Sequence, residues 1–295
     1  MKAGYSDVIS YYLCILVFAD NFWLIGKSPT ELEGMTKLWQ ERMASLGWTV
    51  PAEDFCWGTT EEDNVVMNIK LGEKVLRRVK RTEGFNVLGT ILTFDGKTNV
   101  EFSNRCDRAW AAFWASKEIF RRFEANLFKR MQMLERFVGP SLLWCAGSWK
   151  LTKQQRKKLN SIQRQMVMKM LNFKSRPGET TEEIMKRINS RVTDVIIDSN
   201  IPTFRDLYCR SYFRWAGSLF SILNYDPNRI TYHILRYKDL ASLRDYAARH
   251  RGRQGHAGSI FRHFEDRDLD WRRCASDEAC WAEHQDDFVR WMSEQ

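Results

Sequence analysis

Apolar residues in the first third of the chain occur in short runs, which is typical of β-strands separated by turns. Residues 11–18 form an aromatic and aliphatic run short enough for a buried strand. Asp20 and Asn21 are turn formers, and residues 22–25 are again apolar. The pattern therefore predicts a β-hairpin over residues 11–25.

Two further strand signals follow. Alternating apolar residues over 65–71 precede a turn at Gly72–Glu73, and the chain returns over 75–79. Another strand is predicted over 85–92, before a second turn at Asp95–Gly96.

One amphipathic helix separates these strands. Ser28 is a capping candidate, Pro29 suits the first helical position, and Glu31 completes a capping box. Gly47 is expected to end the helix. Its apolar face is formed by residues at three- and four-residue steps, namely Leu32, Met35, Trp39, Met43 and Leu46.

Helical spacing dominates from residue 97 onward. Apolar residues keep a helical period from Phe113 to Val138, and Pro140 is expected to end that helix. Thr152 and Gln155 form a capping box that opens another helix. That helix has an apolar face of Leu159, Ile162, Met166 and Met170.

A Pro177–Gly178 break leads to a third region, which is also helical, with a loose joint at residues 250–258. The pattern predicts an α+β chain: a small antiparallel sheet with one packed helix over residues 1–96, then helical regions over 97–175 and 176–295.

Charge is concentrated in one part of the chain. The whole chain has a net charge of +9, but residues 121–191 contain 17 Lys and Arg against five Asp and Glu, a local net of +12. Such a block favours a polyanionic partner. A solvated helix surface is the alternative interpretation. The low glycine and proline content excludes collagenous and low-complexity chains.

No membrane partner is predicted, because the longest apolar stretch, residues 11–26, is short and contains Asp20. The seven cysteines are scattered without a Cys-x-x-Cys pair, so neither a disulfide framework nor a zinc knuckle is indicated. Cys274, Cys280 and His284 are close in sequence, but their spacing fits no common zinc pattern. An intracellular location, nuclear or cytoplasmic, is expected.

Asp20 is the candidate for chemistry. A carboxylate between two apolar strands can present a ligand to Mg²⁺, which prefers hard oxygen donors. Two such ions would support nucleotidyl transfer. Asp-Asn is equally good turn chemistry and needs no metal.

Residues 18–21, Phe-Ala-Asp-Asn, resemble the [YF]-A-D-D active-site hairpin of reverse transcriptases, and their surroundings resemble the non-LTR, LINE-type retrotransposon branch. The order and spacing of further segments support the resemblance over nearly the whole chain. These segments are Gly-Trp-Thr-Val at 47–50, Val-Leu-Gly-Thr-Ile-Leu at 87–92, Arg-Cys-Asp-Arg-Ala at 105–109, Leu-Leu-Trp-Cys-Ala-Gly-Ser-Trp at 142–149, and the tail from Trp271 to Phe288.

The resemblance implies an RNA-directed DNA polymerase, a nucleotidyltransferase of a transposable element that uses Mg²⁺. It would make residues 1–96 a partial palm, 97–175 a thumb and 176–295 a C-terminal extension. Asp20 would be the metal carboxylate, and Val87, Leu88 and Gly89 would support the primer end. Nucleic acid would be bound by Arg121, Arg122, Lys129, Arg130, Lys153, Arg156, Lys157, Lys158 and Arg164.

Departures from the family pattern lead us to expect a truncated, degenerate fragment that is inactive alone but still binds RNA, DNA or an RNA–DNA duplex. Asn21 replaces the second hairpin aspartate, and an earlier catalytic carboxylate of the family has no counterpart in the 19 residues before Asp20. Self-association, or pairing with a missing upstream polymerase portion, is also expected. Two alternatives stay open: a non-catalytic helical protein that binds nucleic acid, and an interaction module whose tryptophans bind a protein.

Overall fold

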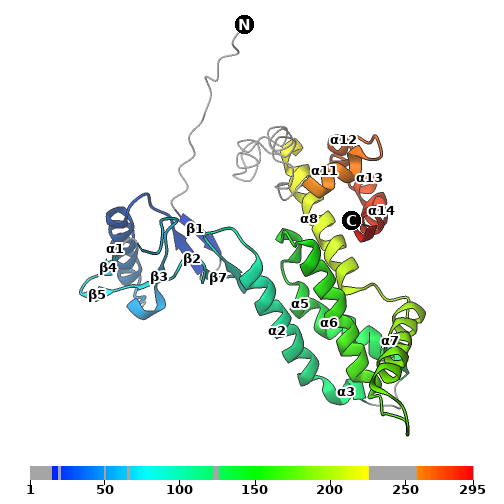
Figure 1. Cartoon of the computed structure of the whole chain (residues 1–295). Helices are drawn as coiled ribbons and strands as arrows, with labels where there is room; N and C mark the ends of the chain where they lie inside the picture. Colours follow the sequence, from blue (N-terminus) through cyan, green and yellow to red (C-terminus); the bar gives the residue numbers. More distant parts are fainter. Residues whose placement is uncertain are drawn as a thin grey trace. The chain divides into compact units, whose positions relative to one another are not determined.

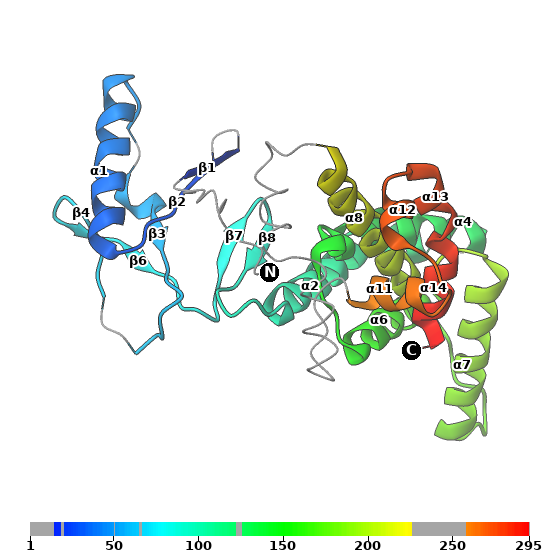
Figure 2. The ribbon, with the colours of Figure 1, turned by 90° about the horizontal axis from the view of Figure 1, so that it is seen from above.

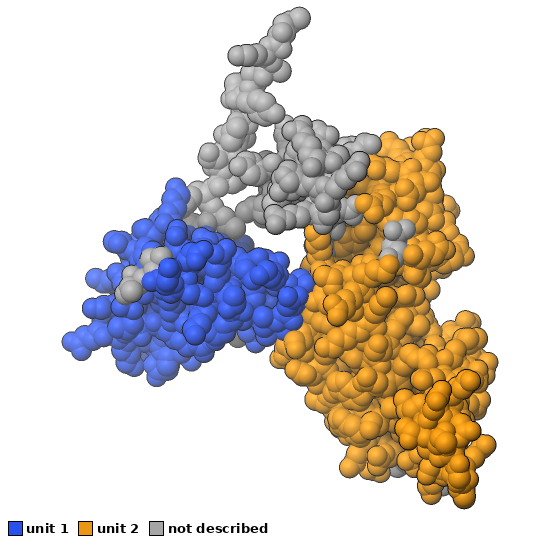
Figure 3. Space-filling model, viewed as in Figure 1, with its two compact units in different colours: residues 1–100 blue, residues 101–295 orange. Residues whose placement is uncertain are grey.

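A computed structural model gives the architecture of the chain. It describes residues 15–18, 21–49, 51–64, 67–121, 126–225 and 258–294. Contacts divide the chain into two compact units, residues 1–100 and 101–295 (Figure 3). The fold is α+β, with helices predominating, and the described strands all lie in the first unit. Each unit is described by itself.

The strands of the first unit are short and pair two by two. Three pairs are antiparallel (β1 with β2, β4 with β5, β7 with β8), and β3 with β6 is parallel. The single small antiparallel sheet expected from the sequence is therefore replaced, among the described residues, by separate pairs. The strands are β1 Ile15–Phe18, β2 Asn21–Leu24, β3 Cys56–Trp57, β4 Lys70–Leu71, β5 Lys74–Val75, β6 Arg77–Arg78, β7 Phe85–Val87 and β8 Thr90–Leu92.

The predicted first hairpin is present as β1 and β2, with Phe18 opposite Asn21 and Ile15 opposite Leu24. The prediction of a buried first strand is wrong for its described part. All four β1 side chains are exposed, Val17 at 66% and Phe18 at 59%.

Helix α1, Pro29–Ser45, begins and ends where the sequence indicates. The Ser28 hydroxyl accepts a hydrogen bond from the Glu31 N–H at 3.2 Å, and the Glu31 carboxylate accepts one from the Lys27 N–H at 2.6 Å. Gly47 adopts φ 81°, which ends the helix. A short 3-10 turn, Ala52–Asp54, follows.

The core of the first unit is small. Its buried members are Trp57, Ile69, Leu71 and Leu76, with Leu32 of α1 packed against them. A separate aromatic contact links the hairpin to α1, because the rings of Phe22 and Trp39 stack at 3.8 Å.

The second unit is built around α8 (Figures 1 and 2). Helices α5, α6, α12, α13 and α14 all contact it. The helices of this part are α2 Asn99–Ala115, α3 Lys117–Arg121, α4 Leu127–Met133, the π-helical η2 Leu134–Val138, α5 Gly139–Leu143, the 3-10 turn η3 Ala146–Ser148, α6 Lys153–Leu171, α7 Thr181–Asp198, α8 Phe204–Tyr225, α11 Gly258–Glu265, α12 Trp271–Ala275, α13 Glu278–Glu283 and α14 Gln285–Glu294.

The stretch from Phe113 to Val138 is several short helices instead of one long helix. Pro140 does not end a helix as expected: α4, the π-helical η2 and α5 follow one another without a gap, and Pro140 lies directly after the π-helical turn, where the hydrogen-bond ladder is already irregular. The apolar residues keep a helical period across these helices because each short helix contributes residues, such as Phe113, Phe120 and Val138, to the same core.

That core extends from Phe102 on α2 to Met292 on α14. Helix α8 and the C-terminal helices meet through Trp281, whose indole N–H donates to the Phe213 carbonyl at 3.0 Å. Gly217 leaves room for the indole, because a Cβ there would overlap it. Of the described helices, none is both long enough and apolar enough to cross a bilayer.

Candidate nucleic-acid interface

Helix α6 is positioned by its two ends and by its apolar face. The predicted capping box is present: the Gln155 N–H donates to the Thr152 hydroxyl at 3.2 Å, and the Thr152 N–H donates to the Gln155 side chain at 2.9 Å. The predicted apolar residues Leu159, Ile162, Met166 and Met170 are all buried. The opposite side of the helix is thereby fixed toward solvent.

The solvent side of α6 carries lysines and neutral polar residues, and the helix contains no Asp or Glu. At about 100° per residue, Lys153 and Lys157 follow one edge of this arc and Lys158 and Lys169 the other. Gln154, Ser161 and Gln165 lie between the two edges. We call these seven exposed residues the lysine face.

The lysine face is electrostatically unbalanced. Among the described residues, no ion pair involves Lys153, Lys157, Lys158 or Lys169. Lys158 also lies over the Phe102 ring, with its Nζ 5.8 Å from the ring centroid. From Lys153 to Lys169 the face is about 24 Å long.

The two arginines of α6 that were predicted to bind nucleic acid, Arg156 and Arg164, have intramolecular contacts instead. Arg156 points toward the buried side of α6 and donates from Nη1 to the Leu151 carbonyl at 3.1 Å. Arg164 is half-buried and donates to the Thr193 hydroxyl at 3.0 Å and to the Asn189 carbonyl at 3.2 Å, both on α7. Arg164 therefore joins two helices.

Arg130 is also structural. It is 6% exposed, and its Nη1 donates to the carbonyls of Phe120 and Met170 at 3.0 and 3.1 Å. These carbonyls lie at the C-terminal ends of α3 and α6, so Arg130 ties α4 to both. Burial lowers the pKa of this guanidinium. A side chain so enclosed cannot reach a phosphate, which removes it from the predicted interface.

Two other residues that were predicted to bind nucleic acid, Arg121 and Lys129, are exposed. Arg121 ends α3 and Lys129 lies on α4. Arg130 donates to the carbonyls of Phe120 and Met170, and Met170 is near the end of α6. Arg121 follows Phe120 and Lys129 precedes Arg130 in the chain, so both exposed cations lie near that end of α6. Arg122 lies outside the described residues.

The predicted catalytic hairpin is described only in part. Asp20 lies outside the described residues, whereas Asn21 is exposed at the start of β2. Among the described residues, no cluster of three carboxylates could hold a metal ion. The neutral amide of Asn21 is a poor substitute for a second carboxylate, so these residues do not fit a two-Mg²⁺ site.

Val87, Leu88 and Gly89, predicted to support a primer, form the tip of a hairpin. The single strand expected over 85–92 is wrong: β7 and β8 pair antiparallel, with Val87 opposite Thr90. Leu88 and Gly89 have φ of 50° and 80°, as a two-residue type I′ turn requires. Leucine is rare in this region of φ and is 43% exposed here.

The sequence did not single out Lys169 as a binding residue, nor the polar residues between the lysines. The helical period contained the signal, because Gln154, Ser161 and Gln165 fall on the side opposite the apolar face. Comparison with models of protein families, with curated proteins and with solved structures found no match to this chain.

Proposed function

We propose that this chain binds the phosphate backbone of an RNA–DNA duplex, or of a related nucleic acid, through the lysine face of α6. The observation that carries the proposal is the set of four exposed lysines that form no ion pair with any described residue, on a helix that lacks acidic residues. Phosphate contacts position a protein on nucleic acid without reading its sequence. Binding should therefore be largely independent of base sequence.

The arrangement of the lysine face suits a backbone better than a compact anion. Two edges of lysines separated by Gln154, Ser161 and Gln165 extend along about 24 Å of helix, roughly seven base-pair steps of a duplex at about 3.4 Å each. The neutral side chains between them can donate hydrogen bonds to phosphate or sugar oxygens.

The wider proposal rests on the resemblance: residues 1–96 are a degenerate reverse-transcriptase palm, 97–175 its thumb, and 176–295 its extension. The chain alone then binds nucleic acid without polymerising. Asn21 supports the absence of catalysis, because it offers a neutral ligand where a two-metal site needs a carboxylate. Docking of a protein through Trp281 and Trp291 is less favoured, since they are 6% and 7% exposed and packed in the core. The alternative of a tryptophan-based protein interaction therefore rests on the exposed Trp48, Trp114 and Trp144.

Binding across a salt series tests the lysine face. The Kd for an RNA–DNA duplex is measured for the wild type and for a variant with Lys153, Lys157, Lys158 and Lys169 changed to Ala. Each phosphate contact contributes about 0.9 to the slope of log K against log salt, so the variant should lose about 3 to 4 of that slope. Affinity at low salt should fall by at least tenfold for every duplex sequence.

The matched control removes four exposed lysines elsewhere, namely Lys37, Lys70, Lys80 and Lys117. It has the same net charge as the first variant and should keep most of the wild-type slope. If the two variants lost equal affinity and salt slope, net charge alone would explain the effect, and the proposal would be contradicted. Primer extension with Mg²⁺, measured on the same protein, should be absent; extension that Asp20→Ala abolishes would overturn the non-catalytic part.

A further inference from the structure

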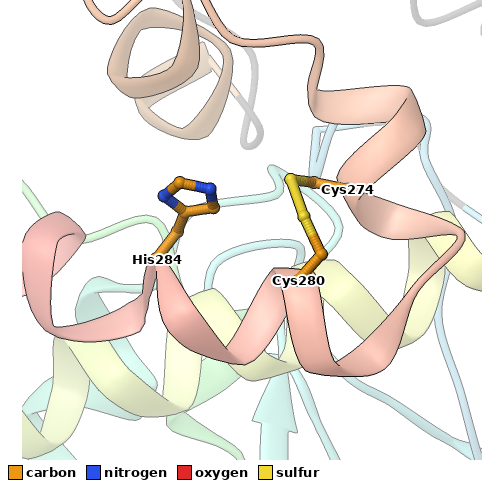
Figure 4. Close-up of side chains that lie close together, drawn as sticks. All are labelled: Cys274, Cys280 and His284. Carbon is orange, nitrogen blue, oxygen red and sulfur yellow. A yellow bond between two sulfur atoms is a disulfide. The ribbon is translucent and has the colours of Figure 1, made fainter.

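Three side chains able to bind a metal meet in the C-terminal helices, far in sequence from the lysine face. The sulfurs of Cys274 and Cys280 and an imidazole nitrogen of His284 lie within 4.8 Å of one another (Figure 4). Cys274 is buried, and Cys280 and His284 are half-buried. The two sulfurs are joined as a disulfide in this structure.

The backbone holds these three groups together. Cys274 lies near the end of α12, and the Asp277 N–H donates to its carbonyl at 3.1 Å. The Asp277 side chain caps α13 by accepting hydrogen bonds from the N–H groups of Ala279 and Cys280. Cys280 and His284 are four residues apart, so both project from the same side of the helix.

The surroundings restrict the movement of this cluster. The His284 ring packs edge-on against Phe264, with centroids 5.3 Å apart. Trp281, between Cys280 and His284, is anchored to α8 by its bond to Phe213. A site supported by packed neighbours on two helices is better organised for a metal than one on a loop.

The donor set determines the kind of metal. Two thiolates and an imidazole are the ligands that Zn²⁺ takes in proteins, whereas Mg²⁺ and Ca²⁺ take oxygen. With Zn–S bonds of about 2.3 Å and Zn–N bonds of about 2.0 Å, neighbouring ligand atoms of a tetrahedron are roughly 3.5 to 3.8 Å apart. Donors already within 4.8 Å reach that spacing by small side-chain rotations.

We propose that Cys274, Cys280 and His284 bind one Zn²⁺ ion when the two cysteines are reduced, with water or an external donor in the fourth position. The disulfide and the metal exclude each other, because the S–S bond uses both sulfurs. A phosphine reductant breaks that bond: the phosphorus takes an oxygen from water, and the two water protons go to the thiols. Zinc binding then displaces those protons.

Zinc would connect α12 to α13 and so hold the segment that carries Trp281 on α8. A ligand that binds only the folded state raises stability in proportion to the logarithm of its concentration over Kd. The reduced chain should therefore gain thermal stability from zinc, and the oxidised chain should not.

Cobalt provides a direct test, since Co²⁺ occupies zinc sites and its spectrum reports its ligands. The reduced full-length chain, freed of phosphine without air, is titrated with Co²⁺. We expect one ion per chain, with thiolate charge-transfer absorption in the near ultraviolet and displacement by one equivalent of Zn²⁺. Cys280→Ser and His284→Ala should each weaken binding by at least tenfold. Cys145→Ser, which removes an exposed cysteine outside the cluster, should bind like the wild type.

Circular dichroism of each variant establishes that its helices are intact. The absence of thiolate charge transfer in the reduced wild type would overturn the proposal. So would undiminished Co²⁺ affinity in folded Cys280→Ser together with folded His284→Ala. Loss of binding in Cys145→Ser, with the other variants unaffected, would place the metal elsewhere and equally overturn it.

Discussion

At the scale of single residues, His263 on α11 has the least ordinary environment. It is fully buried, and among the described groups neither of its ring nitrogens has a hydrogen-bond partner. Phe264, Phe288 and Trp291 present their rings to it at 5.4, 5.3 and 5.7 Å. Burial among these rings, followed by the cationic Arg267 nearby, lowers the pKa of His263 to about 4.

Protonation of His263 should make the fold sensitive to acid. An unfolded histidine titrates near 6.5, so the folded chain resists protonation that the unfolded chain accepts. The free energy of unfolding is therefore unaffected by this group above pH 6.5. It falls by on the order of 3 kcal/mol as the pH drops from 6.5 toward 4. Urea unfolding at pH 7.5, 6, 5 and 4 measures this change for the wild type and for His263→Phe.

Carboxylates with lowered pKa values, such as Glu179 and Asp287, also make the folded chain less stable as the pH falls through the lower part of this range. The comparison of the wild type with His263→Phe isolates the contribution of the histidine. The free energy of unfolding of His263→Phe should fall less steeply with acid. Parallel curves for the two proteins would show that this histidine does not titrate with folding.

At the scale of elements, helices with local end signals were predictable. Ser28 and Gly47 delimit α1, and Thr152 opens α6, because a cap satisfies backbone groups within a few residues of itself. The breaks between α2, α3 and α4 were not predictable from apolar spacing. Consecutive short helices that face one core preserve nearly the same spacing as one long helix.

Two predictions about the strands were wrong. The turn at Leu88–Gly89 was missed because leucine rarely adopts a positive φ, so residues 85–92 read as one strand. The exposure of β1 was missed because an apolar run indicates a strand without identifying what covers it.

The candidate interface was predictable in part. Helical period and charge located the exposed Lys153, Lys157 and Lys158 of α6 but not Lys169. They could not separate Arg130, Arg156 and Arg164 from those lysines, because the carbonyl and hydroxyl partners that hold the arginines come from tertiary packing or from chain turns. Asp20 and Asn21 remain predictions.

The contact between α8 and α13 allows a test at this scale. Gly217→Ala should destabilise the chain by about 1 to 3 kcal/mol, because the new methyl group would overlap the Trp281 indole. Gly34→Ala in α1 is the control for an added methyl group, since its Cβ meets no atom within 4 Å and alanine favours a helix. Chemical unfolding followed by tryptophan fluorescence compares them. Equal stability of the two variants would mean that α13 does not pack on α8 as described.

At the scale of the whole molecule, the two units differ in how much apolar surface they bury. The core of residues 101–295 is continuous across the eleven described α-helices from α2 to α14. In the described part of the first unit the core cluster has four buried residues, while β1 exposes Ile15, Leu16, Val17 and Phe18. Small cores give marginal stability, and exposed apolar strands invite pairing with another chain.

Cutting the chain before α2 should therefore give two fragments with different behaviour. Residues 97–295 should be monomeric and unfold cooperatively, because their core is intact. Residues 1–96 should self-associate through the exposed β1 strand, and Val17→Lys should reduce that association by placing a charge on it. Light scattering after size-exclusion chromatography measures the masses, and urea unfolding measures cooperativity. A monomeric, cooperatively folded fragment of residues 1–96 would show that its small core suffices and that the β1 surface needs no covering partner.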